Sequence, residues 1–289
     1  MVEYDPHSWW AHFWDIRGSM VRAIGMRVLV CTLWACLVVE ACDAGLPLAV
    51  PPTGHGLVGV ALGLLLVFRT NASYDRFWEG RKMWGGIVNE TRNLARGVSA
   101  MLTRDPALAG ALIRWTACFP TAVMNSLRGG KGLGSLALEL PPDEVQSVMS
   151  AEHTPLAVST RMTALLCSAQ QRGLLTPHQL VWLDGNIQSL VDYMGACERI
   201  QKTPLPFAYV VHLRRALLLY CYTLPFATVK DFGMGAALCT LLIAYTFFGI
   251  EEIGVEIENP FGADDNDLPL ERICSTIDTN LRAMLPRPE

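Results

Sequence analysis

The sequence predicts an all-α, polytopic membrane protein that combines four transmembrane helices with a cytoplasmic helical region. Only 17% of the 289 residues are charged, whereas a typical soluble domain carries about 25%. Four apolar segments occur in two pairs, and the residues between the pairs carry apolar positions at helical spacing, as in Leu183, Ile187 and Leu190. We therefore expect a single domain over residues 1–289, with membrane helices at about 22–45, 54–78, 207–229 and 231–252 and a cytoplasmic helical region at about 79–206 and 253–289.

The first pair of apolar segments covers residues 24–39, interrupted only by Arg27, and residues 56–68, which contain no charge. The loop between them, residues 40–55, contains no lysine or arginine. Basic residues lie on both flanks instead: Arg17 and Arg22 before the pair, and Arg69, Arg76, Arg81, Lys82, Arg92 and Arg96 after it. Because basic residues favour the cytoplasmic side of a membrane, we expect this pair to form a hairpin whose loop faces outward.

The second pair covers residues 216–229 and 232–250, and it is joined around Lys230. Only its last segment approaches the roughly 20 apolar residues that a spanning helix needs. The shorter segments require polar ends that are buried in a bundle or line a water-filled path. The chain opens without the basic start and short apolar run of a signal peptide. We therefore expect a multi-pass protein with both termini in the cytoplasm.

Composition and motifs argue against several other functions. The net charge of −4 does not suggest a nucleic-acid partner, because such a partner needs a basic face. The nine cysteines include no Cys-x-x-Cys pair, which leaves no zinc-like spacing. No nucleophile elbow, Walker loop, zinc-protease motif or dinucleotide fingerprint occurs, so we do not expect an enzyme.

Two alternatives to a channel stay open at this level. A membrane-bound metal enzyme would use the acidic and histidine side chains near the end of the last apolar segment and beyond: Glu251, Glu252, Asp264, Asp265, Asp267, and His178 or His212. A transporter with alternating access would favour inverted repeats and broken helices, and no such repeat is evident.

Buried charges need partners. We therefore expect Glu251, Glu252, Glu256 and Glu258 to pair with the charged residues that directly follow Phe68 or to add negative potential.

The second apolar segment has the pattern of a pore wall. Val60, Leu64 and Phe68 recur at i, i+4 and i+8 and so share one helical face. Gly59 and Gly63 form a small-xxx-small pattern that lets neighbouring helices approach closely. Bulky apolar residues stacked around an axis gate by dewetting, although the same periodicity also fits ordinary core or lipid-facing positions.

Three blocks of sequence resemble the bestrophin family, in its bacterial branch. They are residues 68–85 (FRTNASYDRFWEGRKMWG), residues 195–200 and 203–209 (GACERI and TPLPFAY), and residues 259–268 (NPFGADDNDL). The resemblance implies a homopentamer in a lipid bilayer, with four membrane helices per subunit and a central pore for small inorganic ions. Animal members are calcium-activated anion channels, and some bacterial relatives favour monovalent cations. We therefore expect a cation-permeable channel in the inner (plasma) membrane, with a calcium-activated chloride channel as the alternative and a secondary transporter as a further one.

The resemblance also assigns positions along the pore. The family's neck corresponds to Val60, Leu64 and Phe68, which is the face that helical spacing picks out independently. The cytoplasmic aperture corresponds to His178, with Val181 one turn further as the fallback. Histidine is the side chain that changes charge near neutral pH, so five copies would make the exit pH-sensitive.

The acidic block resembles the calcium-binding motif of the calcium-activated relatives. The matching positions are Asn259, Asp264 and Asp267, with Glu256 as the upstream side chain. Hard oxygen ligands at close spacing suit calcium, so no cofactor is required but Ca²⁺ is a candidate. Aspartate and asparagine also cap helices and form solvated turns, and this second interpretation stays open.

Overall fold

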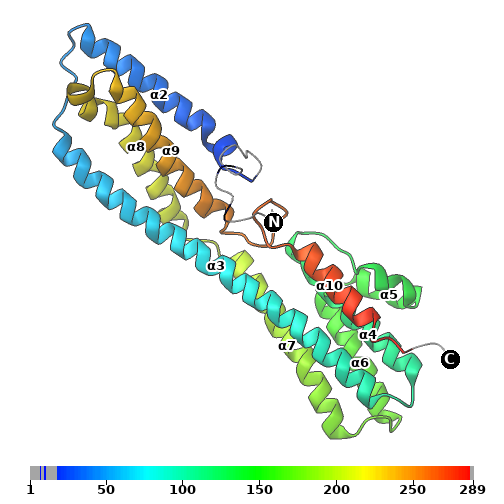
Figure 1. Ribbon diagram of the computed structural model, residues 1–289. Coiled ribbons are helices and arrows are strands. Elements are labelled where there is room, and N and C mark those ends of the chain that lie inside the picture. The colour runs from blue at the N-terminus through cyan, green and yellow to red at the C-terminus, as the bar shows by residue number, and fades with distance from the viewer. Residues whose placement is uncertain (1–6, 8–9, 11–17, 287–289) are drawn as a thin grey trace. The chain divides into compact units, whose positions relative to one another are not determined.

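The computed structural model describes residues 7, 10 and 18–286, and every regular element in them is helical. Arg17, which contributed to the predicted orientation, lies outside these residues. The helices, labelled as in Figure 1, are α2 (Val21–Asp43), α3 (Pro52–Met101), α4 (Pro106–Leu127), the 3₁₀ helix η1 (Ser135–Glu139), α5 (Pro142–Ser150), α6 (Thr154–Gln171), α7 (Pro177–Lys202), α8 (Phe207–Phe232), α9 (Gly235–Glu256) and α10 (Leu270–Arg282). The predicted all-α class is confirmed.

The chain divides into two compact units. Unit 1 comprises Met1–Phe77, Pro204–Pro260 and Asp264–Asp267, and unit 2 comprises Trp78–Thr203, Phe261–Ala263 and Leu268–Glu289. Helix α3 contributes its first half to unit 1 and its second half to unit 2. The divisions at residues 77 and 203 lie close to the predicted limits of the membrane segments, and the single domain over the whole chain stays a prediction.

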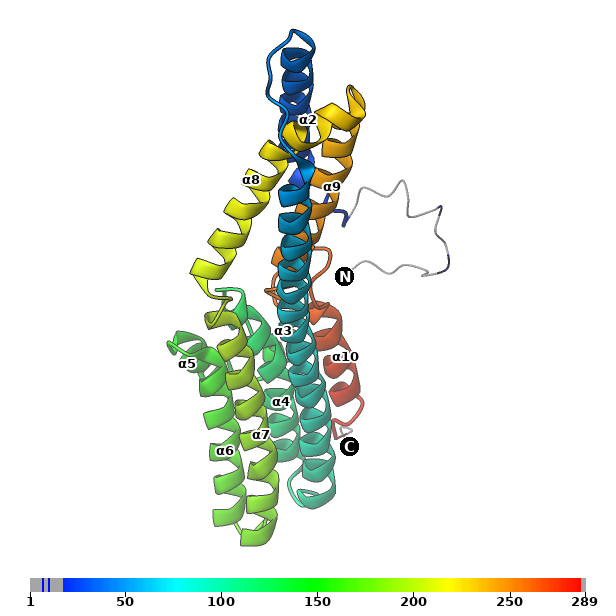
Figure 2. The ribbon, with the colours of Figure 1, turned by 90° about the vertical axis from the view of Figure 1, so that its left-hand side faces the viewer.

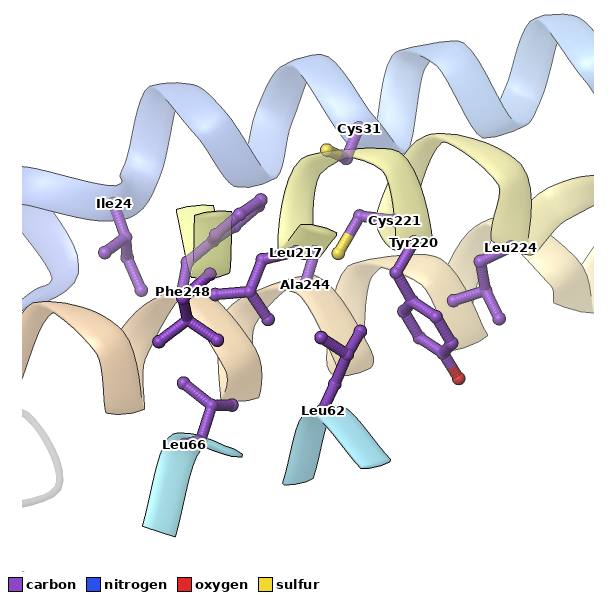
Figure 3. Close-up of a cluster of buried hydrophobic side chains, with 11 residues drawn as sticks. Ile24, Cys31, Leu62, Leu66, Leu217, Tyr220, Cys221, Leu224, Ala244 and Phe248 are labelled. Atoms are coloured by element: carbon purple, nitrogen blue, oxygen red, sulfur yellow. The ribbon is translucent and has the colours of Figure 1, made fainter. Parts of the chain in front are cut away.

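In unit 1, α2, α8 and α9 pack pairwise against one another (Figures 1 and 2). Their shared core is apolar and includes Ile24, Leu217 and Phe248. Leu62 and Leu66 of α3 point into this cluster (Figure 3). One face of α3 is thus attached to the bundle, and this attachment determines which face of α3 is left free.

In unit 2, α4 is the central helix and packs against α6, α7, α10 and η1 (Figure 2). Capping interactions define where several helices begin. The Asp105 carboxylate accepts the Leu108 amide ahead of α4, and the Thr176 hydroxyl accepts the Gln179 amide in a capping box ahead of α7. Proline occupies the first turn of both helices, where its missing N–H costs no hydrogen bond.

The four predicted membrane helices correspond to α2, α3, α8 and α9, with one difference in length and one in hydropathy. Helix α3 does not end near residue 78 but continues to Met101. By length and apolarity, the candidate spans in the described residues are α2, α3, α4 and α9, and α8 is not among them. His212, Arg214 and Arg215 lower the hydropathy of α8.

Helix α4 differs from the other candidate spans in its burial. Its apolar window is 67% buried within the protein, whereas the windows of α2, α3 and α9 are 22–28% buried. This burial is the pattern of a core helix.

Candidate functional site

The three predicted neck residues share one exposed face of α3. Val60, Leu64 and Phe68 are 67%, 57% and 64% exposed within the chain. At about 100° per residue, Leu64 lies about 160° around the helix from the buried Leu62. These side chains therefore point away from the core of unit 1. Their assignment to a pore neck stays a prediction.

The same face continues beyond the apolar residues. Asn71 and Asp75 follow Phe68 at i+3 and i+7, and both are exposed. Because positions i, i+3, i+4 and i+7 share one helical face, the face changes along α3 from apolar to amide and then to carboxylate.

Close packing of α8 positions the first turn of the neck. The hydroxyl of Tyr220 occupies the space beside Gly59, where an added Cβ atom would lie 2.6 Å from it. The Tyr220 ring stacks on His55 with centroids 4.2 Å apart, and His55 Nε2 donates to the Tyr220 carbonyl oxygen at 3.2 Å. Gly63 has open space beside it in the chain. Of the predicted small-residue pair, Gly59 is therefore used within the subunit, and Gly63 is left for an external contact.

A buried ion pair follows the neck directly. Arg69 is 1% exposed, its Nη2 donates to a Glu258 carboxylate oxygen at 2.7 Å, and its Nη1 donates to Ser73 Oγ at 3.0 Å. The Leu205 amide donates to the other Glu258 oxygen at 2.8 Å. Burial raises the pKa of Glu258, but the Leu205 amide and the Arg69 guanidinium outweigh this effect and hold it below its usual value of 4.5. The pair joins α3 to the residues after α9 and before α8.

Two further ion pairs join the helices of unit 1. Arg27 of α2 pairs with Glu252 of α9 at 2.7 Å, and Arg214 of α8 pairs with Glu251 of α9 at 2.8 Å. For Glu251 and Glu252, the first of the two expectations, pairing with the charged residues that directly follow Phe68, is therefore wrong. The reason is that both carboxylates face α2 and α8 across the bundle, and helical spacing carries no information about which helices become neighbours.

The predicted aperture residues lie at the start of α7 in unit 2. His178 is the second residue of the helix, Val181 lies one turn further, and both are exposed. Leu183 and Ile187 are buried on the opposite side of the helix. The exposed face is available to a pore or to another subunit, and the aperture assignment stays a prediction.

The acidic segment brings together three of its four predicted ligands. Glu256, Asn259 and Asp264 line one cavity of about 370 Å³ in unit 1. Asp267 has a different environment, because it is buried and its carboxylate accepts the backbone amide of Asp264 at 2.7 Å. Asp267 thus closes the turn that presents Asp264, but as a buried side chain and not in the solvated turn of the second interpretation.

Within the residues that the structure describes, no group of three or more histidine, cysteine, aspartate or glutamate side chains is placed to hold a metal ion. The predicted calcium ligands also include an asparagine and backbone carbonyls, so the calcium site stays a prediction. Glu251 and Glu252, which the metal-enzyme alternative needs, are paired with arginines.

Comparison with known proteins agrees with this architecture. A voltage-dependent anion channel-forming protein of Nostoc sp. is 40% identical over 277 residues, which cover 94% of this chain and 90% of the relative. A protein of the same description from Escherichia coli K12 is 30% identical over 288 residues, which cover 98% of this chain and 94% of the relative. The crystal structure of a bacterial bestrophin homolog from Klebsiella pneumoniae matches with a TM-score of 0.85 at 28% identity, over 92% of this chain and all of that chain.

The family described as Bacterial/Fungal Bestrophin protein matches residues 1–283. This match confirms the resemblance that the three sequence blocks indicated, and the chain belongs to the bacterial/fungal bestrophin family.

Proposed function

We propose that the chain is one subunit of a pentameric membrane channel for small monovalent ions, with Val60, Leu64 and Phe68 as its hydrophobic neck. The observation that carries the proposal is the exposed face of α3, where these three residues point away from the subunit core. Around a symmetry axis, the face would form three apolar rings with no charge, which gate by dewetting more than by attraction of one ion type.

Monovalent cations are the permeant ions that the geometry favours. Asp75 extends the neck face beyond Phe68 and is exposed. A ring of carboxylates at the end of the neck concentrates cations and repels anions. We also propose Glu256, Asn259 and Asp264 as oxygen ligands for calcium, on the basis of the cavity that they share.

Anions are the second candidate, because the Nostoc and Escherichia coli relatives are both described as voltage-dependent anion channel-forming proteins. The uncharged neck is compatible with either sign. For localisation we propose the inner membrane with both termini in the cytoplasm, since Arg22 and Arg27 lie in the first two turns of α2 and the loop from residue 44 to 51 has no basic residue.

The test is the reversal potential of the purified protein in a planar bilayer under a potassium chloride gradient. Movement toward the potassium potential supports the cation channel, and Asp75→Asn should then reduce the preference. Movement toward the chloride potential, unaltered by Asp75→Asn, refutes the cation assignment and supports the anion candidate. The control is Glu40→Gln, because Glu40 is an exposed carboxylate on α2. It should leave the reversal potential, and with it the ion preference, unchanged.

The neck is tested by widening it. Leu64→Ala and Phe68→Ala should each raise the single-channel conductance, since a smaller ring lowers the barrier to hydration. Leu33→Ala on α2 removes an equally exposed apolar side chain and should leave the conductance unchanged. A conductance equal to that of the wild type in Leu64→Ala and Phe68→Ala would argue against the neck. A native mass that differs from five times the mass of the chain would argue against the pentamer.

A further inference from the structure

A small cavity with a charged rim and an apolar floor lies among α2, α8 and α9. Its volume is about 170 Å³, and it is lined by Arg27, Arg214, Glu251, Leu217, Leu218 and Phe248. At about 30 Å³ for each water molecule, this space is enough for a phosphate group. No step of ion conduction described above uses this cavity.

The two guanidinium groups on the rim have donors to spare. Arg27 uses Nη1 to bind Glu252, and Arg214 uses Nε to bind Glu251. The two arginine side chains are 46% and 50% exposed, whereas Glu251 is 3% exposed. Because a guanidinium has five N–H donors in a fork that matches the oxygens of carboxylates and phosphates, each arginine keeps its carboxylate and still offers N–H groups to a ligand in the cavity. The carboxylates hold the arginines in place.

An apolar surface leads from the cavity along the helices. Leu218 and Tyr222 follow Arg214 at i+4 and i+8 on α8, and both side chains are partly exposed. On α2, Trp34 lies two turns beyond Arg27, and its Nε1 donates to the Tyr222 carbonyl oxygen at 2.9 Å. The two helices thus present a continuous apolar surface on the side of the cavity that faces the middle of the predicted membrane span.

The depth of the cavity fits the edge of a bilayer. Arg27 and Arg214 lie in the second turn of their helices, and Glu251 lies in the second-last turn of α9. At 1.5 Å per residue, these positions are about 8–10 Å from the helix ends. The polar layer on each side of a ~30 Å hydrocarbon core is roughly 5–8 Å thick. Helix ends at the outer edge of that layer would therefore bring the guanidinium groups near the boundary between headgroups and acyl chains.

We propose that this cavity binds the phosphate group of an anionic phospholipid in the cytoplasmic leaflet, with an acyl chain along Leu218 and Tyr222. Each arginine keeps its carboxylate partner, so the headgroup is selected by the remaining guanidinium N–H donors, which would bind the phosphate oxygens. The apolar surface selects a lipid over free phosphate. The site requires the chain to lie in a membrane but is independent of which ion the channel conducts.

The experiment uses the full-length protein purified in detergent and titrated with phosphatidylglycerol, with phosphatidylcholine of the same chains, and with inorganic phosphate. Native mass spectrometry counts the bound lipids and subunits. The variants are Arg27→Gln and the double change Arg214→Gln with Glu251→Gln, which removes the second guanidinium without leaving a buried carboxylate unpaired. The matched control is Arg215→Gln, because Arg215 is exposed on the same helix but does not line the cavity.

We expect the wild type and Arg215→Gln to prefer phosphatidylglycerol, and each cavity change to reduce that preference about fivefold. The same preference in all four proteins would overturn the proposal. A second measurement is the unfolding temperature of the wild type with each additive. If inorganic phosphate raised it as much as phosphatidylglycerol does, the ligand would be a free anion, and this result would also overturn the proposal. Loss of subunits from Arg27→Gln without a change in lipid preference would identify this surface as a contact between copies of the chain and would also overturn it.

Discussion

Replacing Arg69 with methionine removes the guanidinium from the buried ion pair behind the neck and keeps most of the side-chain length. Removing one partner of a buried pair generally costs about 3–5 kcal/mol, because it leaves a desolvated charge. Arg69 is 1% exposed, but Glu258 is 16% exposed and keeps the Leu205 amide at 2.8 Å. We therefore expect Arg69→Met to lower the free energy of unfolding by about 3 kcal/mol, at the lower end of that range.

The double variant Arg69→Met with Glu258→Leu separates the pair from the packing. It leaves no unpaired charge, and apolar replacements of a whole buried pair are often neutral or stabilising. We expect it to be more stable than Arg69→Met alone. Arg81→Met is the matched control, since Arg81 is exposed on the same helix, and it should change stability by no more than about 0.5 kcal/mol.

The assay is denaturant unfolding of the detergent-solubilised protein, followed by tryptophan fluorescence, at neutral and acidic pH. The folded-state pKa of Glu258 lies below its usual value of 4.5, so its stabilising contribution is present above that pH and is lost as the pH falls through the lowered pKa. The stability difference between wild type and Arg69→Met should shrink accordingly in acid. Equal stability of wild type and Arg69→Met at neutral pH, or a double variant that is no more stable than Arg69→Met alone, would refute the reasoning.

Three further predictions concern the neck, the aperture and the acidic segment. Gly59→Ala should destabilise the protein by about 1–3 kcal/mol in the same unfolding assay, because the new Cβ would lie 2.6 Å from the Tyr220 hydroxyl, whereas Gly63→Ala meets no atom within 4 Å and should be tolerated. His178→Ala should abolish any change in current across about pH 6 to 8, and a pH response identical to that of the wild type would exclude the histidine aperture. Asp264→Ala should raise the calcium concentration that half-activates the current at least about tenfold. The same half-activating concentration as in the wild type would remove the aspartate from the site.

The helices at the two apolar pairs lie close to their predicted positions, because apolar runs and their flanking residues are local properties. The segment predicted at about 207–229 is observed as Phe207–Phe232, and the one at about 231–252 as Gly235–Glu256. The membrane segment predicted at about 54–78 corresponds to the first half of α3, whose hydropathy falls after Phe68 while the helix continues to Met101. Apolarity marks where the membrane environment ends, and it does not mark where a helix ends.

Helix α4 shows the opposite limitation. Its apolarity alone qualifies it as a spanning helix, yet most of its apolar window is buried against other helices of unit 2. Composition alone cannot separate a core helix from a membrane helix, since both are rich in apolar residues. The sequence predicted a cytoplasmic position for this region because it lies between the two apolar pairs, where apolar positions recur at helical spacing.

The sequence by itself determined the fold class, the approximate helix positions, the family and the face of α3 that carries Val60, Leu64 and Phe68, because each depends on residue types at local spacing. Only the tertiary structure decided which charges are partners. Arg69 and Glu258 are 189 residues apart in the chain, and Arg27 and Glu252 are 225 apart. Helical periodicity orients a side chain about its own helix, but the packing of one helix against another selects its partner, and the ion pairs beside the neck and the arginine-lined cavity follow from that packing.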